Sequence, residues 1–514
     1  AAARLVRRGS RQHRDVERTG VLLGDQIAEV VGLAVGDRAL GVGVHVDRIE
    51  LERLGGALEN ALRLLLVASP AQAAMVTAAP YGWMQSRRER YGDVFSSHFP
   101  FFGRVVYVAD PALVKEVFAG DPAVFHAGEA NATVLGDALG DNSLLTLDEG
   151  RHLSQRKLLL PPFHGAAVRR YADVMAEATA REVEGWPVGR AFPLRPRMQA
   201  ITLEVILRAV FGVRDGRRMD LFRERIPRLG NLSSVLDWLP FMQSDLGGLT
   251  PAARFRKAVA AVDELIYAEI AERREQGEAA ADRDDVLTLL LSARHEDGSP
   301  MSDVELRDQL MTLLTAGHET TATGLSWAFE RLLRTPPAME RLLESLDDDE
   351  YLDAVVKETL RVRPVIVDVA RKLTRDTQVG AWRLPAGTMV LPAIAAIHAR
   401  PDLYPAPEEF RPERFLEAET ESYAWIPFGG GVRRCIGASF AQVEMRVVLR
   451  EVLRRVRLRA DSRRPERPQV RHVTVVPSRG CRVVVEERLG EPVAVASPAE
   501  RTAAEPAHRP AALA

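Results

Sequence analysis

The sequence predicts a mainly helical α+β protein, with small β-sheets confined to a few places along the chain. Three observations support this prediction. A very long helical pattern begins at SDVE, residues 302–305, where Ser302 and Glu305 predict a capping box, and it stops before Pro336. Amphipathic helical stretches precede it, and another helix follows Cys435. The strand patterns are short and lie apart from one another.

The first predicted elements lie at residues 104–120, RVVYVADPALVKEVFAG, which predict a strand, a turn at Asp110-Pro111 and a helix. Amphipathic helices then continue to about Arg274. The stretch EQGEAAADRDD is polar throughout, so we expect a surface loop there.

The last third of the chain contains two predicted β-hairpins. Residues 378–394, QVGAWRLPAGTMVLPAI, predict a hairpin that turns at residues 385–387. Residues 438–456 predict a helix, and residues 471–487, RHVTVVPSRGCRVVVEE, predict the second hairpin. We expect these sheets to lie apart from the helical body.

The composition excludes several classes of protein. A net charge of -2 over 514 residues favours neither nucleic acid nor an anionic membrane. Two cysteines, Cys435 and Cys481, exclude a disulfide framework and a cysteine-rich zinc site, and they favour a reducing, cytoplasmic setting. The apolar stretch at residues 54–76 is interrupted by three polar residues and broken by Pro70, so we expect no transmembrane anchor.

The chain divides by composition into three parts. Residues 1–74 contain no methionine and few aromatic residues. We interpret them either as an N-terminal extension or, the reading we favour, as upstream sequence that the native protein lacks. Residues 75–489 form the folded domain. Residues 490–514 are rich in Ala, Pro and Glu, which predicts a disordered tail.

A glycine-rich loop surrounds one of the two cysteines. FGGGVRRCIG, residues 428–437, has the pattern FGxGxRxCxG around Cys435. Glycines allow a close approach to a flat cofactor, the following helix directs its first amides toward the sulfur, and Arg433 can bind a carboxylate. These features suit a cysteine thiolate on haem iron, with Arg433 on a propionate. The alternative, a buried structural cysteine, fits Cys481 better.

The long helical pattern contains AGHETT, residues 316–321, at its middle. Leu313, Ala316, Gly317 and Thr320 fall on one helix face, and the small residues leave room for a ligand. The alternative is a polar patch on a solvent face, with Gly317 serving close packing. The apolar flanks LMTLL and ATGLSWAF argue for burial instead. We treat His318 as a bystander.

FGGGVRRCIG and AGHETT, together with KETLR at residues 357–361 and FRPERF at residues 410–415, resemble the motifs of the cytochrome P-450 family of haem-thiolate monooxygenases. The resemblance spans about residues 81–487 and implies the family's fold, soluble bacterial type, with haem between the long helix and the cysteine-loop helix. It implies that Glu319 is the acid of a proton relay and that Thr320 is the hydroxyl that steadies dioxygen. It implies haem b, with these residues at the cofactor: His152, Arg156, Ala316, Gly317, Arg371, Phe428, Gly429, Arg433, Cys435 and Gly437.

The resemblance further implies a structural ion pair and the partners of the reaction. Glu358, Arg361 and Arg414 match the family's three-way pair beside the haem loop. Electrons from NAD(P)H would come through a separate ferredoxin or flavodoxin with its reductase. Such an acidic carrier could dock on arginines near the proximal face, although a solvated helix face is an equal alternative for each of them: Arg434, Arg446, Arg450 and Arg454.

The expected substrate pocket is apolar. By family analogy it is lined by Leu144, Leu145, Leu313, Val365, Ile366, Val367, Val369, Val475 and Val476, although several of these are equally suited to the core. Such a lining implies a lipophilic substrate: a fatty acid, terpenoid, steroid or polyketide. We expect a monomer that hydroxylates or epoxidises it. The alternatives are a peroxide-driven peroxygenase and a non-catalytic haem sensor, and the Glu319–Thr320 pair argues against both.

Overall fold

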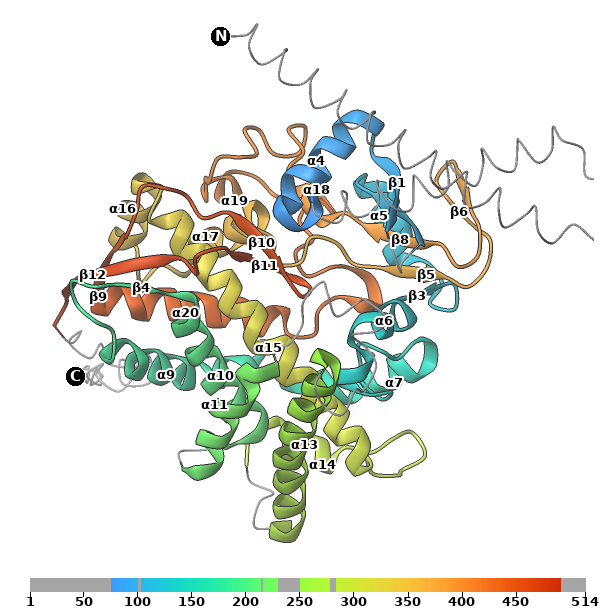
Figure 1. Cartoon of the computed structure of the whole chain (residues 1–514), viewed down its shortest axis with the longest axis horizontal. Coiled ribbons are helices and arrows are strands. Elements are labelled where there is room, and N and C mark those ends of the chain that lie inside the picture. The colour runs from blue at the N-terminus through green and yellow to red at the C-terminus, as the bar shows by residue number, and fades with distance from the viewer. Residues whose placement is uncertain are drawn as a thin grey trace, which may run out of the picture. The chain divides into compact units, whose positions relative to one another are not determined.

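The computed structural model describes residues 75–99, 103–163, 165–213, 216–229, 250–277 and 283–490. The expectations for residues 1–74 and for the tail after Gly490 lie outside these ranges. The mainly helical α+β prediction is confirmed, because long helices form the body and small, separate sheets lie around it (Figure 1).

The helices are these: α4 (Pro80–Tyr91), α5 (Pro111–Ala119), α6 (Ala127–Leu139), α7 (Glu149–Leu159), α8 (Ala166–Arg170), α9 (Ala172–Glu184), α10 (Arg195–Phe211), α11 (Arg217–Leu229), α13 (Pro251–Gln276), α14 (Val286–Ser292), α15 (Asp303–Leu332), α16 (Pro336–Glu344), α17 (Asp349–Val362), α18 (Ile394–His398), α19 (Arg414–Glu417) and α20 (Ala438–Arg455). Two short 3₁₀ turns are η2 (Pro161–Phe163) and η5 (Gly431–Arg433). The strands are these: β1 (Val94–Phe99), β2 (Gly103–Val108), β3 (Phe125–His126), β4 (Ala191–Pro193), β5 (Arg371–Leu373), β6 (Thr377–Val379), β7 (Trp382–Leu384), β8 (Met389–Pro392), β9 (Val456–Ala460), β10 (Pro468–Arg471), β11 (Thr474–Pro477) and β12 (Arg482–Arg488).

The largest described sheet has the strand order β1-β2-β8-β5-β3. β1 and β2 pair antiparallel, with Phe95 opposite Tyr107, and β2 pairs parallel with β8. The predicted strand, turn and helix at residues 104–120 are confirmed as β2 and α5. Asp110 caps α5, since its carboxylate accepts the Leu113 amide at 3.0 Å.

The predicted hairpin at residues 378–394 is wrong in its turn. β6 pairs with β7, and Gly380-Ala381 form the turn between them. β8 does not pair with β7 but lies in the large sheet, between β2 and β5. Gly380 has a φ of +54°, which suits a tight two-residue turn. Burial of Val390 stabilises β8 in the core, whereas Trp382 in β7 is 45% exposed.

The predicted second hairpin, at residues 471–487, is also wrong. β11 pairs with β10 on its N-terminal side, while β12 pairs with β4 and β9 in another sheet. Gly480 and Cys481 both have positive φ, +73° and +53°, so the chain changes direction between β11 and β12. Residues Val483–Val485 are buried in that second sheet.

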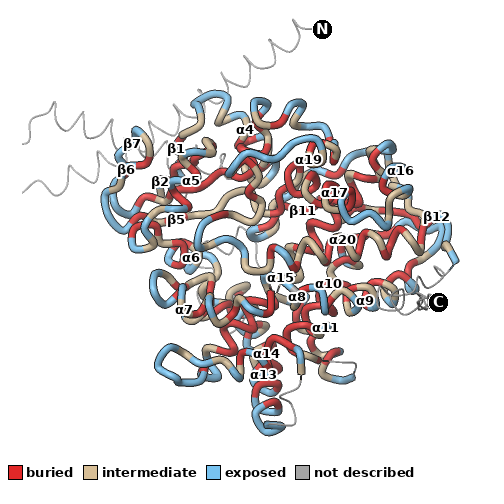
Figure 2. The backbone as a smooth tube through the Cα atoms, turned by 180° about the vertical axis from the view of Figure 1, so that it is seen from behind, coloured by how far each residue is buried: buried red, intermediate tan, exposed pale blue. Residues whose placement is uncertain are grey.

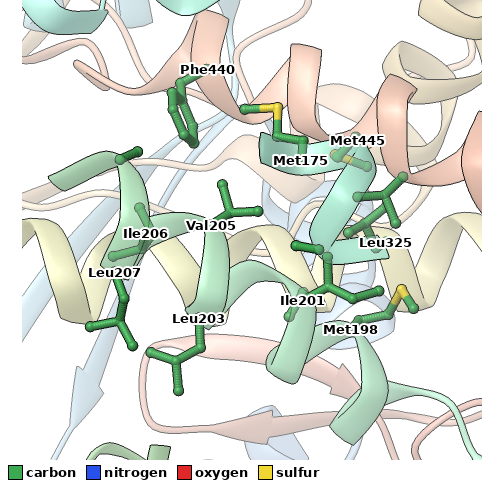
Figure 3. Packing of buried hydrophobic residues seen from close by; sticks show 14 of the residues in the cluster. Met175, Met198, Ile201, Leu203, Val205, Ile206, Leu207, Leu325, Phe440 and Met445 are labelled. Atoms are coloured by element: carbon green, nitrogen blue, oxygen red, sulfur yellow. The ribbon is translucent and has the colours of Figure 1, made fainter. Parts of the chain in front are cut away.

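The long helix α15 organises the core. Its predicted capping box is confirmed, because the Ser302 hydroxyl accepts the Glu305 amide and the Glu305 carboxylate accepts the Ser302 amide. Side chains of α9, α10, α15 and α20 meet in one cluster, which includes Met175, Met198, Leu325 and Met445 (Figure 3). Buried residues concentrate in these central helices and exposed ones in the outer loops (Figure 2).

Candidate active site

The glycines of the cysteine loop allow the loop to pack closely against α5. Gly429 and Gly431 have φ of +67° and +63°. A Cβ on Gly431 would lie 2.0 Å from the carbonyl oxygen of Phe118, and one on Gly430 would lie 2.4 Å from the Phe118 ring. The Cys435 amide donates to the carbonyl of Phe428 at 2.9 Å, which closes the loop. Two of the glycines are therefore required by protein packing.

Cys435 is an exposed residue, yet protein atoms remove much of the water from around its thiol. The residue is exposed, whereas Cys481 is buried, as expected for a core position. Desolvation raises the pKa of the Cys435 thiol, while the Gly437 amide and the charges of Arg156 and Arg434 act to lower it. α20 begins one residue after Gly437. These donors and charges favour a thiolate once a metal binds it.

Four predicted cofactor residues gather as a cluster of basic groups: His152 and Arg156 from α7, Arg371 from β5, and Arg433 from η5. Burial, helped by the three arginines, lowers the pKa of His152 to about 3. Burial also lowers the pKa of Arg371 and of Arg433 to about 10.

One carboxylate, Asp148, partly balances this cluster. It ion-pairs with Arg433, whose Nη1 also donates to the carbonyl of Leu144 at 3.2 Å. The basic groups still lower one another's pKa values, so the cluster has room for further negative charge. A haem with two propionates has the charge that this donor set would bind.

Near its middle, α15 is exposed at Ala316, and we call this exposed point the opening. Between Leu306 and Leu332 Ala316 is the one exposed residue of this helix, all of which the structure describes. The Thr320 hydroxyl lies one turn along and donates to the Ala316 carbonyl at 2.7 Å. Gly317 faces α10 instead, since a Cβ there would lie 2.7 Å from Ile206. His318 binds the Leu314 carbonyl at 2.8 Å.

The carboxylate of Glu319 is held by α10. It ion-pairs with Arg195, and Gln199 Nε2 donates to it at 2.5 Å. The side chain of Arg195 is 7% exposed and that of Glu319 is 21% exposed. The sequence analysis missed both α10 partners, because RPRMQAITLEV shows only a helical pattern.

The predicted ion pair beside the cysteine loop is assembled in the structure. The fully buried Glu358 carboxylate accepts from Arg361 Nε at 2.7 Å and from Arg414 Nε at 3.0 Å. Arg361 also donates to the carbonyls of His398 and Pro407, at 2.9 Å each. The carboxylate therefore joins α17 to the segment that leads to the cysteine loop.

Three of the four arginines expected near the proximal face already have acidic partners in this chain. Arg446 pairs with Asp353 at 3.3 Å, Arg450 with Asp349 at 2.5 Å, and Arg454 with Asp347. The acidic connection before and within α17 supplies these partners. Arg434 is exposed beside Cys435, so the docking hypothesis now depends mainly on that residue.

The residues expected to line the pocket fall into two groups. The first is buried among core residues and consists of Leu144, Leu313, Val365, Val475 and Val476. The second is partly exposed and consists of Leu145, Ile366, Val367 and Val369. By family analogy residues 220–245 would also line the pocket, and residues 230–245 of that region lie outside the described ranges.

A family model described as Cytochrome P450 matches residues 62–484. The match covers more than half of the chain. The chain belongs to the cytochrome P450 family. Two groups of mycobacterial relatives are similar to it. "Putative cytochrome P450 135B1" of Mycobacterium tuberculosis is 49% identical over 424 residues, covering 80% of this chain and 89% of that protein. "Putative cytochrome P450 138" of the same species is 42% identical over 406 residues, covering 78% and 90%.

Solved structures of cytochromes P450 share the fold. The retinoic acid-bound cyanobacterial CYP120A1 is 27% identical, with a TM-score of 0.69, over 79% of this chain and 93% of that one. The haem domain of cytochrome P450DA is 26% identical, with a TM-score of 0.70, over 80% and 94%. The predicted family and fold are thus confirmed.

Membership of the cytochrome P450 family gives the general chemistry of this chain. It is a haem-thiolate monooxygenase in class, with dioxygen as co-substrate and a need for redox partners. The thiol of Cys435, the basic cluster and the opening at Ala316 fit a haem. No helix in the described part of the chain has the length and apolar character to cross a membrane.

Replacing Glu358 with Ala should prevent haem incorporation. Two buried arginines would lose their shared carboxylate, at a cost of about 3–5 kcal/mol. Haem content per protein, from the absorbance ratio and pyridine haemochrome, measures the effect. Glu417→Ala is the control, because it removes only the exposed pair with Arg411 and should cost at most about 1 kcal/mol. Full haem occupancy in Glu358→Ala would contradict this role.

Replacing Gly431 with Ala should destabilise the cysteine loop by about 2–4 kcal/mol, because the positive φ and the clash with Phe118 both oppose a Cβ. Urea unfolding followed by circular dichroism measures the change. Gly136→Ala in α6 is the control, since its Cβ would meet only Ala132 at 3.9 Å. Equal stability of the two variants would show that the loop tolerates a side chain.

Proposed function

We propose that this cytochrome P450 activates dioxygen and hydroxylates or epoxidises a lipophilic small molecule. The observation that carries the proposal is the exposure of Ala316, with the Thr320 hydroxyl beside it, in a stretch of α15 from Leu306 to Leu332 that is otherwise buried or half-buried. A hydroxyl and a small residue at an accessible point within a long buried helix suit a reacting ligand better than a structural role.

In this proposal Cys435 binds the haem iron as a thiolate, and the basic cluster of His152, Arg156, Arg371 and Arg433 holds the propionates. When bound, the haem supplies the iron at which dioxygen is reduced. Arg433 would exchange part of its bonding to Asp148 for a propionate. Its hydrogen bonds to backbone carbonyls in the segment before α7 keep the guanidinium in place for that exchange.

Glu319 would supply protons at the opening, and the Thr320 hydroxyl would position the water that carries them. The Thr320 hydroxyl donates to the Ala316 carbonyl, which leaves its oxygen free to accept a hydrogen bond from water. Glu319 immediately precedes Thr320, so its side chain points about 100° away around the helix. Its carboxylate is held by Arg195 and Gln199. It would have to exchange one of these donors before it could pass a proton toward Thr320.

The substrate and electron donor follow as parts of the same proposal. Ile366, Val367 and Val369 are partly exposed apolar residues in the segment that precedes Arg371, which supports a lipophilic substrate. Electrons would come from NAD(P)H through a ferredoxin or flavodoxin with its reductase. Arg434 is an exposed basic residue beside Cys435 at which an acidic carrier could dock.

The test of thiolate ligation is the carbon-monoxide difference spectrum of the reduced protein. We expect the red-shifted Soret band of a thiolate-ligated ferrous carbonyl. Cys435→His should retain haem and lose that band, because imidazole replaces the sulfur. Cys481→Ser is the control and should keep the band. A wild-type protein that binds haem without the band would overturn the proposal.

Replacing Thr320 with Ala should uncouple the reaction. We expect the product formed per NAD(P)H consumed to fall roughly 10- to 100-fold, with peroxide release rising, because the hydroxyl that positions the proton-carrying water is lost. Thr321→Ala is the matched control, since that hydroxyl donates to Gly317 on another face. Unchanged coupling in Thr320→Ala, or wild-type turnover with peroxide alone, would favour the peroxygenase alternative.

A further inference from the structure

Three polar residues of α10 share one helix face that meets α15. Arg195, Gln199 and Thr202 follow one another at spacings of four and three residues. Arg195 ion-pairs with the carboxylate of Glu319, and Gln199 Nε2 donates to the same carboxylate at 2.5 Å. The Thr202 hydroxyl donates to the carbonyl of His318 at 2.9 Å. This face therefore holds both the carboxylate and the backbone just before it.

α10 and α15 pack closely at this point. Ile206 continues the same face of α10 one turn after Thr202, and a Cβ on Gly317 would lie 2.7 Å from the Ile206 side chain. The space beside Gly317 is therefore filled by α10. Gly317, the His318 carbonyl and the Glu319 carboxylate are three consecutive groups of α15 that contact this face. The AGHETT stretch is thus a contact between two helices as well as the site of the opening.

The backbone of Arg195 is fixed by the turn that follows β11. The Arg195 amide donates to the Gly480 carbonyl at 3.0 Å, and the Leu194 amide donates to the Cys481 carbonyl at 3.1 Å. The Arg195 side chain is 7% exposed, so neighbouring atoms enclose most of its length. These contacts restrict where its guanidinium can lie, and they place it at Glu319.

Arg195 differs from its neighbour Arg197 on the same helix. In the described part of the chain, Glu319 is the one acidic residue that pairs with Arg195. Arg197 is 40% exposed and pairs with Glu182 at 3.2 Å, as is common on a protein surface. A buried cation without its partner is costly, because its charge is then uncompensated. Arg195 and Glu319 are therefore a dedicated pair.

We propose that Arg195 is a positioning residue for proton delivery, which stabilises the carboxylate formed each time Glu319 releases a proton. The inference rests on the proposed function, because it takes Glu319 as the proton donor and Thr320 as the hydroxyl that positions the water. A proton leaves the Glu319 carboxyl group for that water, and the remaining carboxylate binds Arg195 and Gln199. The Glu319 side chain is 21% exposed, so solvent can supply the next proton.

The first test measures how much of the consumed dioxygen is reduced beyond peroxide. Cleavage of the O–O bond requires protons at the distal oxygen, and without them the oxygen leaves as hydrogen peroxide. The fraction of dioxygen not recovered as peroxide therefore reports proton delivery, whether or not the probe is oxidised. The holoprotein is assayed with NAD(P)H, a ferredoxin with its reductase, and dodecanoate as the lipophilic probe. We expect Glu319→Gln to lower this fraction roughly 10-fold, and Arg195→Leu to lower it about as much.

Two further variants serve as controls. Arg195→Lys keeps the cation and should stay within about 3-fold of the wild-type fraction, because the pair uses one guanidinium nitrogen, Nη2, which an ammonium can replace. Arg197→Leu removes a neighbouring arginine of α10 that does not contact Glu319, and it should leave the fraction unchanged. Haem content and the carbon-monoxide band are recorded for every variant. Arg195→Gln takes the place of Arg195→Leu if the leucine variant loses haem.

A double-mutant cycle separates positioning from a purely structural role. Arg195→Leu in the Glu319→Gln background should cause no further loss of the dioxygen fraction, because the carboxylate that Arg195 stabilises is already absent. A structural role for Arg195 elsewhere in α10 would instead give losses that multiply.

The second test is independent of turnover. The infrared difference between wild type and Glu319→Gln identifies the carboxylate stretching band of Glu319. This band should shift in Arg195→Leu, because its charged hydrogen-bond donor is lost, and it should stay in place in Arg197→Leu. An unshifted band in Arg195→Leu would show that the pair does not form in solution.

Three outcomes would overturn the inference: an unshifted band, losses that multiply in the cycle, or an Arg195→Leu variant with full haem content and the wild-type dioxygen fraction. If Glu319→Gln lowers the fraction in the same experiment, the proposed function stands and only the role of Arg195 is lost. If Glu319→Gln leaves the fraction unchanged, the assignment of Glu319 as proton donor fails, and the role of Arg195 fails with it.

Discussion

The buried carboxylate of Glu358 is the interaction on which the active site depends. It binds Arg361 and Arg414, and Arg361 in turn donates to the carbonyl of His398. The His398 ring accepts the Ile426 amide at 3.0 Å, and the Ile426 carbonyl accepts the amide of Gly429. A continuous series of hydrogen bonds thus runs from the ion pair into the loop that presents Cys435. Because every member before the half-buried Gly429 is buried, a loss at the ion pair would be transmitted toward the cysteine.

Charge is distributed unevenly around the site, and this has functional consequences. The basic cluster at His152, Arg371 and Arg433 has one partial counter-charge in Asp148, which suits it to an anionic cofactor. Glu319 has its own cationic partner in Arg195. The basic cluster is therefore the place in this domain that suits a negatively charged ligand group.

The motifs could be predicted from local sequence, because each is a short pattern defined by residue types at a fixed spacing. The capping box at Ser302, the turn at Asp110-Pro111 before α5 and the length of α15 depend on residues close together in the chain. Both hairpin predictions failed for the opposite reason. β8 and β12 pair with strands far away in sequence, and burial of Val390 and Val483 outweighs the local turn signals at Gly387 and Gly480.

The sequence by itself determined the family, the mainly helical class and the chemistry-bearing residues Cys435, Glu319 and Thr320 as candidates. Only the tertiary structure decided what surrounds them. It brought Arg195 to Glu319 and paired the acidic connection with the arginines of α20. These facts join residues separated by tens to hundreds of positions, and the free energy of a charge depends on such neighbours and on its exclusion from water.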